Sequence, residues 1–214
     1  MCGRYLTPDE AALERHFGLA APPDYFQSYN VAPSQLAPAV RADGEGRLEI
    51  RLLVWGYRPG WAKRAWINAR AESILTAKAF APAAHKRRCL VPAMGWYEWQ
   101  GEQAPRKPFV LHLDGFRPLA FAGIWTARET DAGWERSFAI LTTAATDALR
   151  EIHARKPLVL PPEHYSAWLS KDTPPGDVEA LLHADLGGVT AYAVSPFVNK
   201  PENDDARCIQ PAAG

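Results

Sequence analysis

Short apolar runs separated by turn residues dominate the middle of this sequence. The run Leu48–Trp55 follows an Asp-Gly-Glu-Gly turn, and a shorter run, Leu36–Val40, precedes that turn, so the two predict a β-hairpin. Further runs of this kind predict strands at Cys89–Pro92, Phe109–Leu113, Leu119–Trp125, Ser137–Thr142 and Val189–Val194. The central part of the chain is therefore expected to be mostly sheet.

Helix signals are fewer. Thr7 as N-cap, Pro8 in the first turn and Glu10 after the cap predict a helix, and this helix is expected to run to Phe17 and end at Gly18. Other helices are predicted, by residue number, at 71–80, 147–153, 163–169 and 177–184. With 19 Pro and 15 Gly interrupting the pattern, the fold class is a mixed, β-rich α+β fold, and 214 residues fit a single domain, 1–214.

Composition narrows the possible partners and cellular settings of the protein mainly by excluding some of them. Lys and Arg number 24, as do Asp and Glu, so the net charge is zero and a nucleic-acid partner needs a local patch, for which Lys86–Arg88 is a candidate. Cys2, Cys89 and Cys208 show no CxxC spacing, which argues against a disulfide framework and indicates a reducing, cytoplasmic setting. No signal-peptide pattern is visible, and no apolar run reaches the ~18 residues of a membrane span.

The second residue, Cys2, carries the most distinctive chemistry. If Met1 is removed, the α-amine and the thiol of Cys2 form a 1,2-aminothiol, which condenses with an aldehyde to a Schiff base and closes to a five-membered thiazolidine. An α-amine titrates near ~7.7–8.0, against ~10.4 for a lysine, so part of it is a free nucleophile at neutral pH. A cysteine in this position also occurs by chance, and the rest of the chain has to support the interpretation.

Five blocks of sequence, the first of which contains Cys2 itself, support it by their order and spacing. They are Cys2–Tyr5 (CGRY), Tyr29–Pro33 (YNVAP), Trp66–Ser73 (WINARAES), Arg88–Trp99 (RCLVPAMGWYEW) and Ile152–Leu160 (IHARKPLVL). In this arrangement the chain closely resembles the SOS response-associated peptidase (SRAP) family, over nearly its whole length.

The resemblance implies a β-rich, barrel-like core with peripheral helices, and a protein that captures abasic sites in single-stranded DNA. Cys2 would be the nucleophile that forms a stable thiazolidine with the ring-opened deoxyribose, after autocatalytic loss of Met1. Asn68 would hydrogen-bond near the reacting amine and sugar, Glu98 would help to open the sugar ring, and His153 would assist Schiff-base formation and reversal. Weak abasic-site lyase activity would accompany capture.

The resemblance also suggests how DNA is held. The predicted DNA contacts are Arg4, Asn30, Pro33, Trp61, Arg70, Arg88 and Arg155. Guanidinium groups grip phosphates and aromatic faces stack on bases of a single strand, so these residue types suit the task. The protein is expected to act as a monomer with no cofactor, no metal and no membrane partner.

The chemistry of these side chains agrees with the roles that the resemblance implies. Purely structural roles for the same residues stay open. Glu98 lies between aromatic residues, which raises a carboxyl pKa, and His153 titrates near neutrality. Yet Glu98 could be a paired structural carboxylate, His153 could stabilise a helix C-terminus, and Asn68 could cap the following helix. Arg70 and Glu72 could form a local ion pair.

Two other functions remain alternatives. One is a cysteine peptidase in which Cys2 attacks peptide bonds, with its own amine as the base. The other is a binding module whose affinity comes from arginine and tryptophan side chains alone, with Cys2 incidental. A zinc site is not expected, because the spacing of cysteines and histidines fits no zinc motif.

Overall fold

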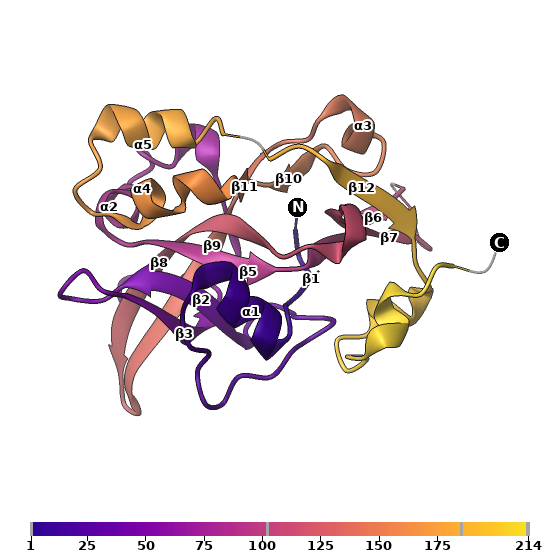
Figure 1. Cartoon of the computed structure of the whole chain (residues 1–214), viewed down its shortest axis with the longest axis horizontal. Helices are drawn as coiled ribbons and strands as arrows, with labels where there is room; N and C mark the ends of the chain where they lie inside the picture. The colour runs from indigo at the N-terminus through magenta and orange to yellow at the C-terminus, as the bar shows by residue number, and fades with distance from the viewer. Residues whose placement is uncertain (1, 102, 185, 213–214) are drawn as a thin grey trace.

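A five-stranded barrel forms the centre of the computed structural model, which describes residues 2–101, 103–184 and 186–212 (Figure 1). Around the barrel the strands follow the order β9 (Gly133–Ala144), β3 (Leu48–Trp55), β2 (Leu36–Ala42), β5 (Arg88–Ala93) and β8 (Leu119–Thr130). The ring closes because β8 pairs with β9 again. Closure leaves the barrel without free edges, and the expectation of a mixed fold with a barrel-like core is confirmed.

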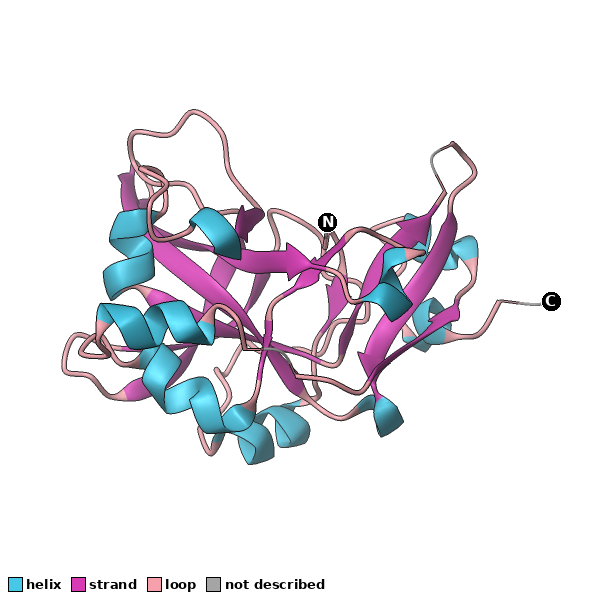
Figure 2. Ribbon diagram, turned by 90° about the horizontal axis from the view of Figure 1, so that it is seen from above, coloured by secondary structure: helices cyan, strands magenta, loops and turns pink. Residues whose placement is uncertain are grey.

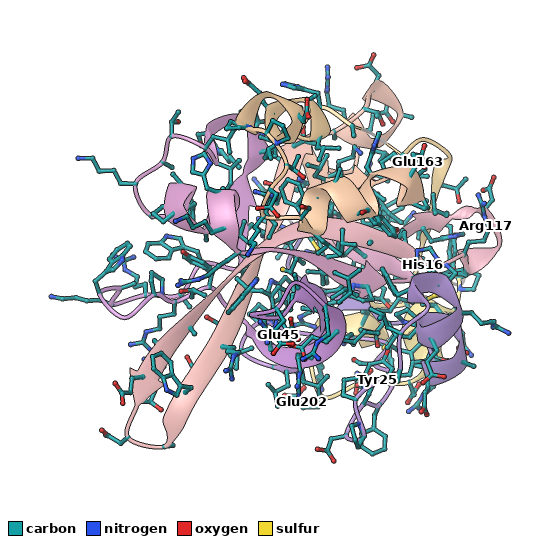
Figure 3. All side chains as sticks on the ribbon, turned by 60° about the vertical axis from the view of Figure 1, so that its left-hand side comes forward. His16, Tyr25, Glu45, Arg117, Glu163 and Glu202 are labelled. Carbon is teal, nitrogen blue, oxygen red and sulfur yellow. The ribbon has the colours of Figure 1, made fainter. Side chains whose placement is uncertain are left out.

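Two hairpins account for most of the barrel. β2 and β3 pair from Leu36↔Val54 to Ala42↔Leu48, across a turn in which Gly46 has a φ of 84°. β8 and β9 pair down to Thr130↔Gly133, and their tip projects away from the barrel (Figure 3). Positive φ is the conformation that glycine adopts without strain, so the glycine in the β2–β3 turn supports its closure.

A second, four-stranded sheet stands beside the barrel (Figure 2). Its order is β1 (Tyr5–Leu6), β6 (Gly95–Gln100), β7 (Lys107–Leu113) and β12 (Val189–Ala193). The chain passes from β5 of the barrel into β6 of this sheet through Met94, whose amide donates to Leu6 O at 2.8 Å. The chain therefore crosses from the barrel to the small sheet at Met94, and β1 lies beside this crossing point.

Three short strands complete the part of the barrel nearest the small sheet. β4 (Asn68–Arg70) runs parallel to β9, and β10 (Arg155–Pro157) runs antiparallel to it. β11 (Val159–Leu160) pairs with β8. As a result, the C-terminal half of β9 has one added strand bearing Asn68 and another that begins at Arg155.

Short helices lie outside the barrel and beside the small sheet (Figure 1). They are α1 (Glu10–Phe17), α2 (Ala81–Lys86), α3 (Asp147–Arg150), α4 (Tyr165–Leu169) and α5 (Pro175–Leu181), with 3₁₀ turns η1 (Ala71–Ser73), η2 (Asp114–Phe116), η3 (Pro162–His164), η4 (Pro196–Asn199) and η5 (Ala206–Ile209). No helix in the described ranges is long and apolar enough to cross a membrane.

The hydrophobic core fills both the barrel and the space under these helices. Inside the barrel, Tyr5 packs edge-on against Trp55 and Phe121, with ring centroids 5.1 and 5.9 Å apart. Trp168 of α4 is fully buried outside the barrel wall, and its indole N–H donates to Cys89 O at 2.8 Å. Tyr5 thereby anchors the N-terminal strand in the barrel interior.

Two helix predictions need correction. The first helix has the predicted end at Gly18, but its N-cap is Asp9, which accepts from Ala12 N at 2.7 Å; Thr7 is buried and its hydroxyl is committed to Ser28. The predicted helix 71–80 is wrong, because only the turn η1 forms there. The hydroxyl of Thr76 donates to a backbone carbonyl at 3.3 Å, a local bond that competes with helix formation.

Gly95→Ala tests the crossing point between barrel and small sheet. An added Cβ would lie 2.5 Å from Leu111 O and 3.1 Å from the Cβ of His112, and a backbone atom in a sheet cannot move away. We expect a loss of about 3 kcal/mol in the free energy of unfolding and a Tm lower by about 6–12 °C. Gly44→Ala is the control, since a Cβ there meets nothing within 4 Å. Equal melting of both variants would contradict the tight approach.

Candidate active site

Cys2 lies fully buried just before β1, where the small sheet meets the barrel. Asn68 of β4 donates its side-chain amide to Cys2 O at 2.7 Å. On the other side, Tyr97 of β6 donates its backbone amide to Arg4 O at 3.0 Å. Backbone and side-chain bonds from both sheets thus fix the segment that carries the thiol.

Glu98 follows on the same strand, β6, and is 3% exposed. Its burial raises the pKa of the carboxyl group from 4.5 to about 7. The pKa of the Cys2 thiol is also raised, chiefly by burial and next by the negative charge of Glu98. The site therefore favours a neutral thiol beside a carboxyl group that titrates near neutral pH.

His153 lies half-buried on the loop between α3 and β10. Its Nδ1 is 3.0 Å from the backbone N and 3.0 Å from the carbonyl O of Arg155, so it accepts from the first when neutral and donates to the second when protonated. Burial lowers the pKa of His153 below 6.5. The loop is held to β6, two residues beyond Glu98, because Gln100 Nε2 donates to Glu151 O at 3.1 Å.

Arg155 connects the His153 loop to the barrel. Its guanidinium donates to both carboxylate oxygens of Glu72, at 2.7 and 3.0 Å, and to the carbonyl of Thr142 on β9 at 2.6 Å. Glu72 follows β4, so one side chain joins β10, β9 and the Asn68 segment. The hydrogen-bonded partner of Glu72 is thus Arg155 rather than Arg70, whose charge makes the smallest contribution to lowering the pKa of Glu72.

Asn68 does not cap the turn that follows it. The N-cap of η1 is Arg70, and no side chain makes a capping bond there. The Oδ1 atom of Asn68 is buried and has no hydrogen-bond partner among the described residues. A buried acceptor without a partner is costly, and such atoms in native proteins often serve a ligand.

Arg4 and Asn30 attach the C-terminal segment to β1. Arg4 donates to Asn30 Oδ1 at 3.1 Å and to Val198 O at 3.2 Å. The amide of Asn30 donates to the carbonyls of Val198, Lys200 and Asn203, at 3.1, 3.0 and 2.8 Å. These bonds give both side chains a structural task beside Cys2, which the sequence alone did not indicate.

The other residues predicted to contact DNA differ in how exposed their side chains are. Arg88 is 4% exposed, and its guanidinium donates to the backbone carbonyls of Ala84, His85, Trp168 and Ser170. It braces α2 and α4 and is not brought to the site. Pro33 and Arg70 are exposed, and Trp61 is 67% exposed with its ring 5.8 Å from that of Trp66. These three offer free surface.

Sequence comparison identifies the family of this arrangement. The family model described as SOS response associated peptidase (SRAP) matches residues 1–201. The chain belongs to the SRAP family.

Relatives of this SRAP chain cover its whole length. Abasic site processing protein YoaM of Bacillus subtilis is 34% identical over 225 aligned residues, 98% of this chain and 97% of YoaM. Abasic site processing protein YedK of Escherichia coli is 31% identical over 226 aligned residues, 99% of this chain and 100% of YedK. A crystal structure of a Bacteroides thetaiotaomicron protein matches with a TM-score of 0.86 over 100% of both chains; at 22% identity, this likeness shows the fold alone.

No cluster of three or more His, Cys, Asp or Glu side chains that could hold a metal ion occurs within the described ranges. All three cysteines are buried and free. The side chains singled out at the SRAP site carry a thiol, a carboxyl group, an imidazole and an amide.

Glu98→Gln tests the buried carboxyl group through stability. Burial in the folded chain raises the pKa of Glu98 from 4.5 to about 7, so the folded chain binds the carboxyl proton more tightly than the unfolded chain. The contribution of this bound proton to stability is therefore lost as the pH rises from 4.5 through 7. Relative to Glu98→Gln, we expect the wild type to lose about 2 kcal/mol of unfolding free energy between about pH 5.5 and 8.5. Denaturant unfolding at both pH values measures this. A difference between the two proteins that does not change with pH would show an ordinary carboxyl pKa.

Proposed function

We propose that this SRAP protein captures abasic sites in single-stranded DNA as a covalent thiazolidine on Cys2, once Met1 has been removed. Relatives that share its full length are named abasic site processing proteins. The observation that carries the proposal is the placement of Cys2 against Asn68 and Glu98 at the junction of two sheets. A thiol with a raised pKa suits this reaction, because it acts after the amine.

The reaction balances without an oxidant or a cofactor. The α-amine of Cys2 adds to the aldehyde carbon of the ring-opened deoxyribose, and the carbinolamine loses one water to give a Schiff base. The thiol sulfur then adds to the imine carbon while its proton moves to the imine nitrogen. One water leaves in total, and a five-membered ring holds the DNA.

Glu98 and His153 would move the protons. Ring opening and loss of water both need a proton donor, and a carboxyl group with a pKa of about 7 is half protonated at neutral pH. His153, with a pKa below 6.5, is mostly neutral there and can accept a proton. At neutral pH about half of the Glu98 carboxyl groups can thus donate a proton while His153 can accept one, as an acid and a base require.

Asn68 would position the amine. Its Nδ2 is committed to Cys2 O, so its buried Oδ1 is the acceptor left for the α-amine or a sugar hydroxyl. A bond from either group would satisfy an atom that otherwise lacks a partner among the described residues.

DNA would cross the exposed residues Arg70, Trp61 and Pro33. Arg70 offers an exposed guanidinium for a phosphate, and Trp61 and Pro33 offer apolar surface against which bases can stack or pack. Arg4 and Arg155 are assigned instead to holding the site together, because their guanidinium groups are bound to Asn30 and Glu72. An abasic nucleotide in a single strand has no partner base to unpair, which lowers the cost of reaching Cys2.

Peptide hydrolysis is less well supported. A cysteine peptidase needs a thiolate nucleophile, and burial together with the charge of Glu98 disfavours that form of Cys2. We infer that proteolysis, where it occurs, is confined to Met1. Strand cleavage by β-elimination would follow from the same Schiff base whenever the thiol fails to close the ring.

Cys2→Ala tests capture directly. Met-trimmed protein, verified by intact mass, is mixed with a single strand carrying one abasic site, and products are separated on a denaturing gel after heating. We expect a slowly migrating band for the wild type without borohydride, and none for Cys2→Ala.

Cys208→Ala is the matched control, since this thiol is equally buried but donates to Asn203 O at 3.1 Å, in the C-terminal segment. It should retain the band. A heat-stable band from Cys2→Ala, or a band with intact DNA, would refute thiazolidine capture.

The pH profile of capture tests the acid role of Glu98. The rate should rise as the α-amine loses its proton near ~8 and fall as Glu98 loses its own near about 7, giving a bell centred between them. Glu98→Gln should be about 10²- to 10³-fold slower and should keep only the rising limb. Single-turnover rates with excess protein measure both. A bell of unchanged shape in Glu98→Gln would assign the falling limb to another group.

A further inference from the structure

A groove lies at the other end of β5 from the site. β5 begins at Arg88, beside the end of α2, and leads at its far end into β6 with Glu98. At its beginning, the β2–β3 turn and the end of α4 enclose a groove of about 390 Å³. Its lining includes Arg41, Leu48, Arg87, Trp125, Leu169 and Lys171.

Positive charge gathers around this groove although the chain has a net charge of zero. Lys86, Arg87 and Lys171 are exposed, and within the described ranges they form no ion pair. Of the two acids in the lining, Asp43 is bound to Arg47 at 3.1 Å, which leaves Asp172 facing three cations. The groove therefore attracts negatively charged groups.

Two arginine side chains of the groove lie over the ring of Trp125. The guanidinium carbon of Arg41 lies 4.6 Å from its ring centroid and that of Arg87 lies 5.8 Å away. Arg41 is also paired with Glu49 at 2.5 Å, but the guanidinium of Arg87 makes no hydrogen bond to any described residue. Arg87 is thus held over an indole ring with its N–H donors available, a geometry that suits a carboxylate.

Apolar surface continues between these cations. Leu48 is 43% exposed at the end of the β2–β3 turn, and Leu169 of α4 and Trp125 also line the groove. A phosphate gains nothing from such surface, and the indole ring on which a base would stack is already overlain by guanidinium groups. An apolar side chain flanked by carboxylates fits both features.

We propose that this groove binds a short acidic peptide segment of a partner protein. Its carboxylates would contact Arg87, Lys86 and Lys171, and one apolar side chain would lie between Leu48 and Trp125. The volume accommodates a few side chains rather than a folded surface. The groove is separate from Cys2, so the partner can be bound while DNA is captured.

Fluorescence anisotropy with a labelled hexapeptide, Asp-Glu-Leu-Asp-Glu-Phe, tests this proposal on the full chain. We expect saturable binding that weakens with salt, at least tenfold weaker binding to Arg87→Glu/Lys171→Glu, and a smaller loss for Arg87→Gln/Lys171→Gln. The matched control is Arg15→Glu/Lys78→Glu, which makes the same charge change at exposed positions outside the groove lining and should stay within twofold of wild type. Melting curves verify folding, and capture by Cys2 should be unchanged in every variant.

Four outcomes would overturn the proposal. The amide peptide Asn-Gln-Leu-Asn-Gln-Phe could bind as tightly as the acidic one, or the groove variants could bind like wild type. Hexathymidylate could bind instead, with the same loss in the groove variants, which would make the groove a nucleic-acid surface. Absence of peptide binding up to about 1 mM, a free energy of about −4 kcal/mol, would equally reject it.

Discussion

The hydrogen bonds of one strand, β9, organise the whole molecule. β9 pairs with β8 and β3 to close the barrel, and its C-terminal half then pairs with β4 and β10. Asn68 belongs to β4, and Arg155 begins β10, so the backbone pairing of these strands with β9 fixes the positions of both residues. A register change along β9 would move these strands together, and the site cannot be rearranged one residue at a time.

The second constraint is electrostatic. Burying a carboxyl group and a thiol near each other costs free energy when either is charged, and the raised pKa values of Glu98 and Cys2 record that cost. In the proposed reaction this burial serves the chemistry, because it leaves the carboxyl group of Glu98 partly protonated at neutral pH. Stability and chemistry are therefore in conflict at this site, as they often are where groups are tuned for a reaction.

Sequence patterns predicted the local features and missed those that depend on distant contacts. β3 has the bounds expected from its turn and its apolar run, since both signals are local. β6 was not predicted, because four of its six residues are buried and no alternation is visible. Cys2, Asn68, Glu98 and His153 were assigned through motifs, and their catalytic roles stay predictions. The Arg155–Glu72 pair and the burial of Arg88 join segments far apart in the chain, and no spacing rule reveals them.

The attachment of residues 198–203 to Arg4 and Asn30 has a consequence for biosynthesis. The segment that carries Cys2 is synthesised well before residues 198–203, to which Arg4 and Asn30 are hydrogen-bonded. Until they arrive, β1 lacks the hydrogen bonds that fix Arg4, and the surroundings of the thiol are incomplete. The hydrogen-bonded surroundings of Cys2 are thus completed only after residues 198–203 have been synthesised, and a chain that lacks them also lacks this arrangement.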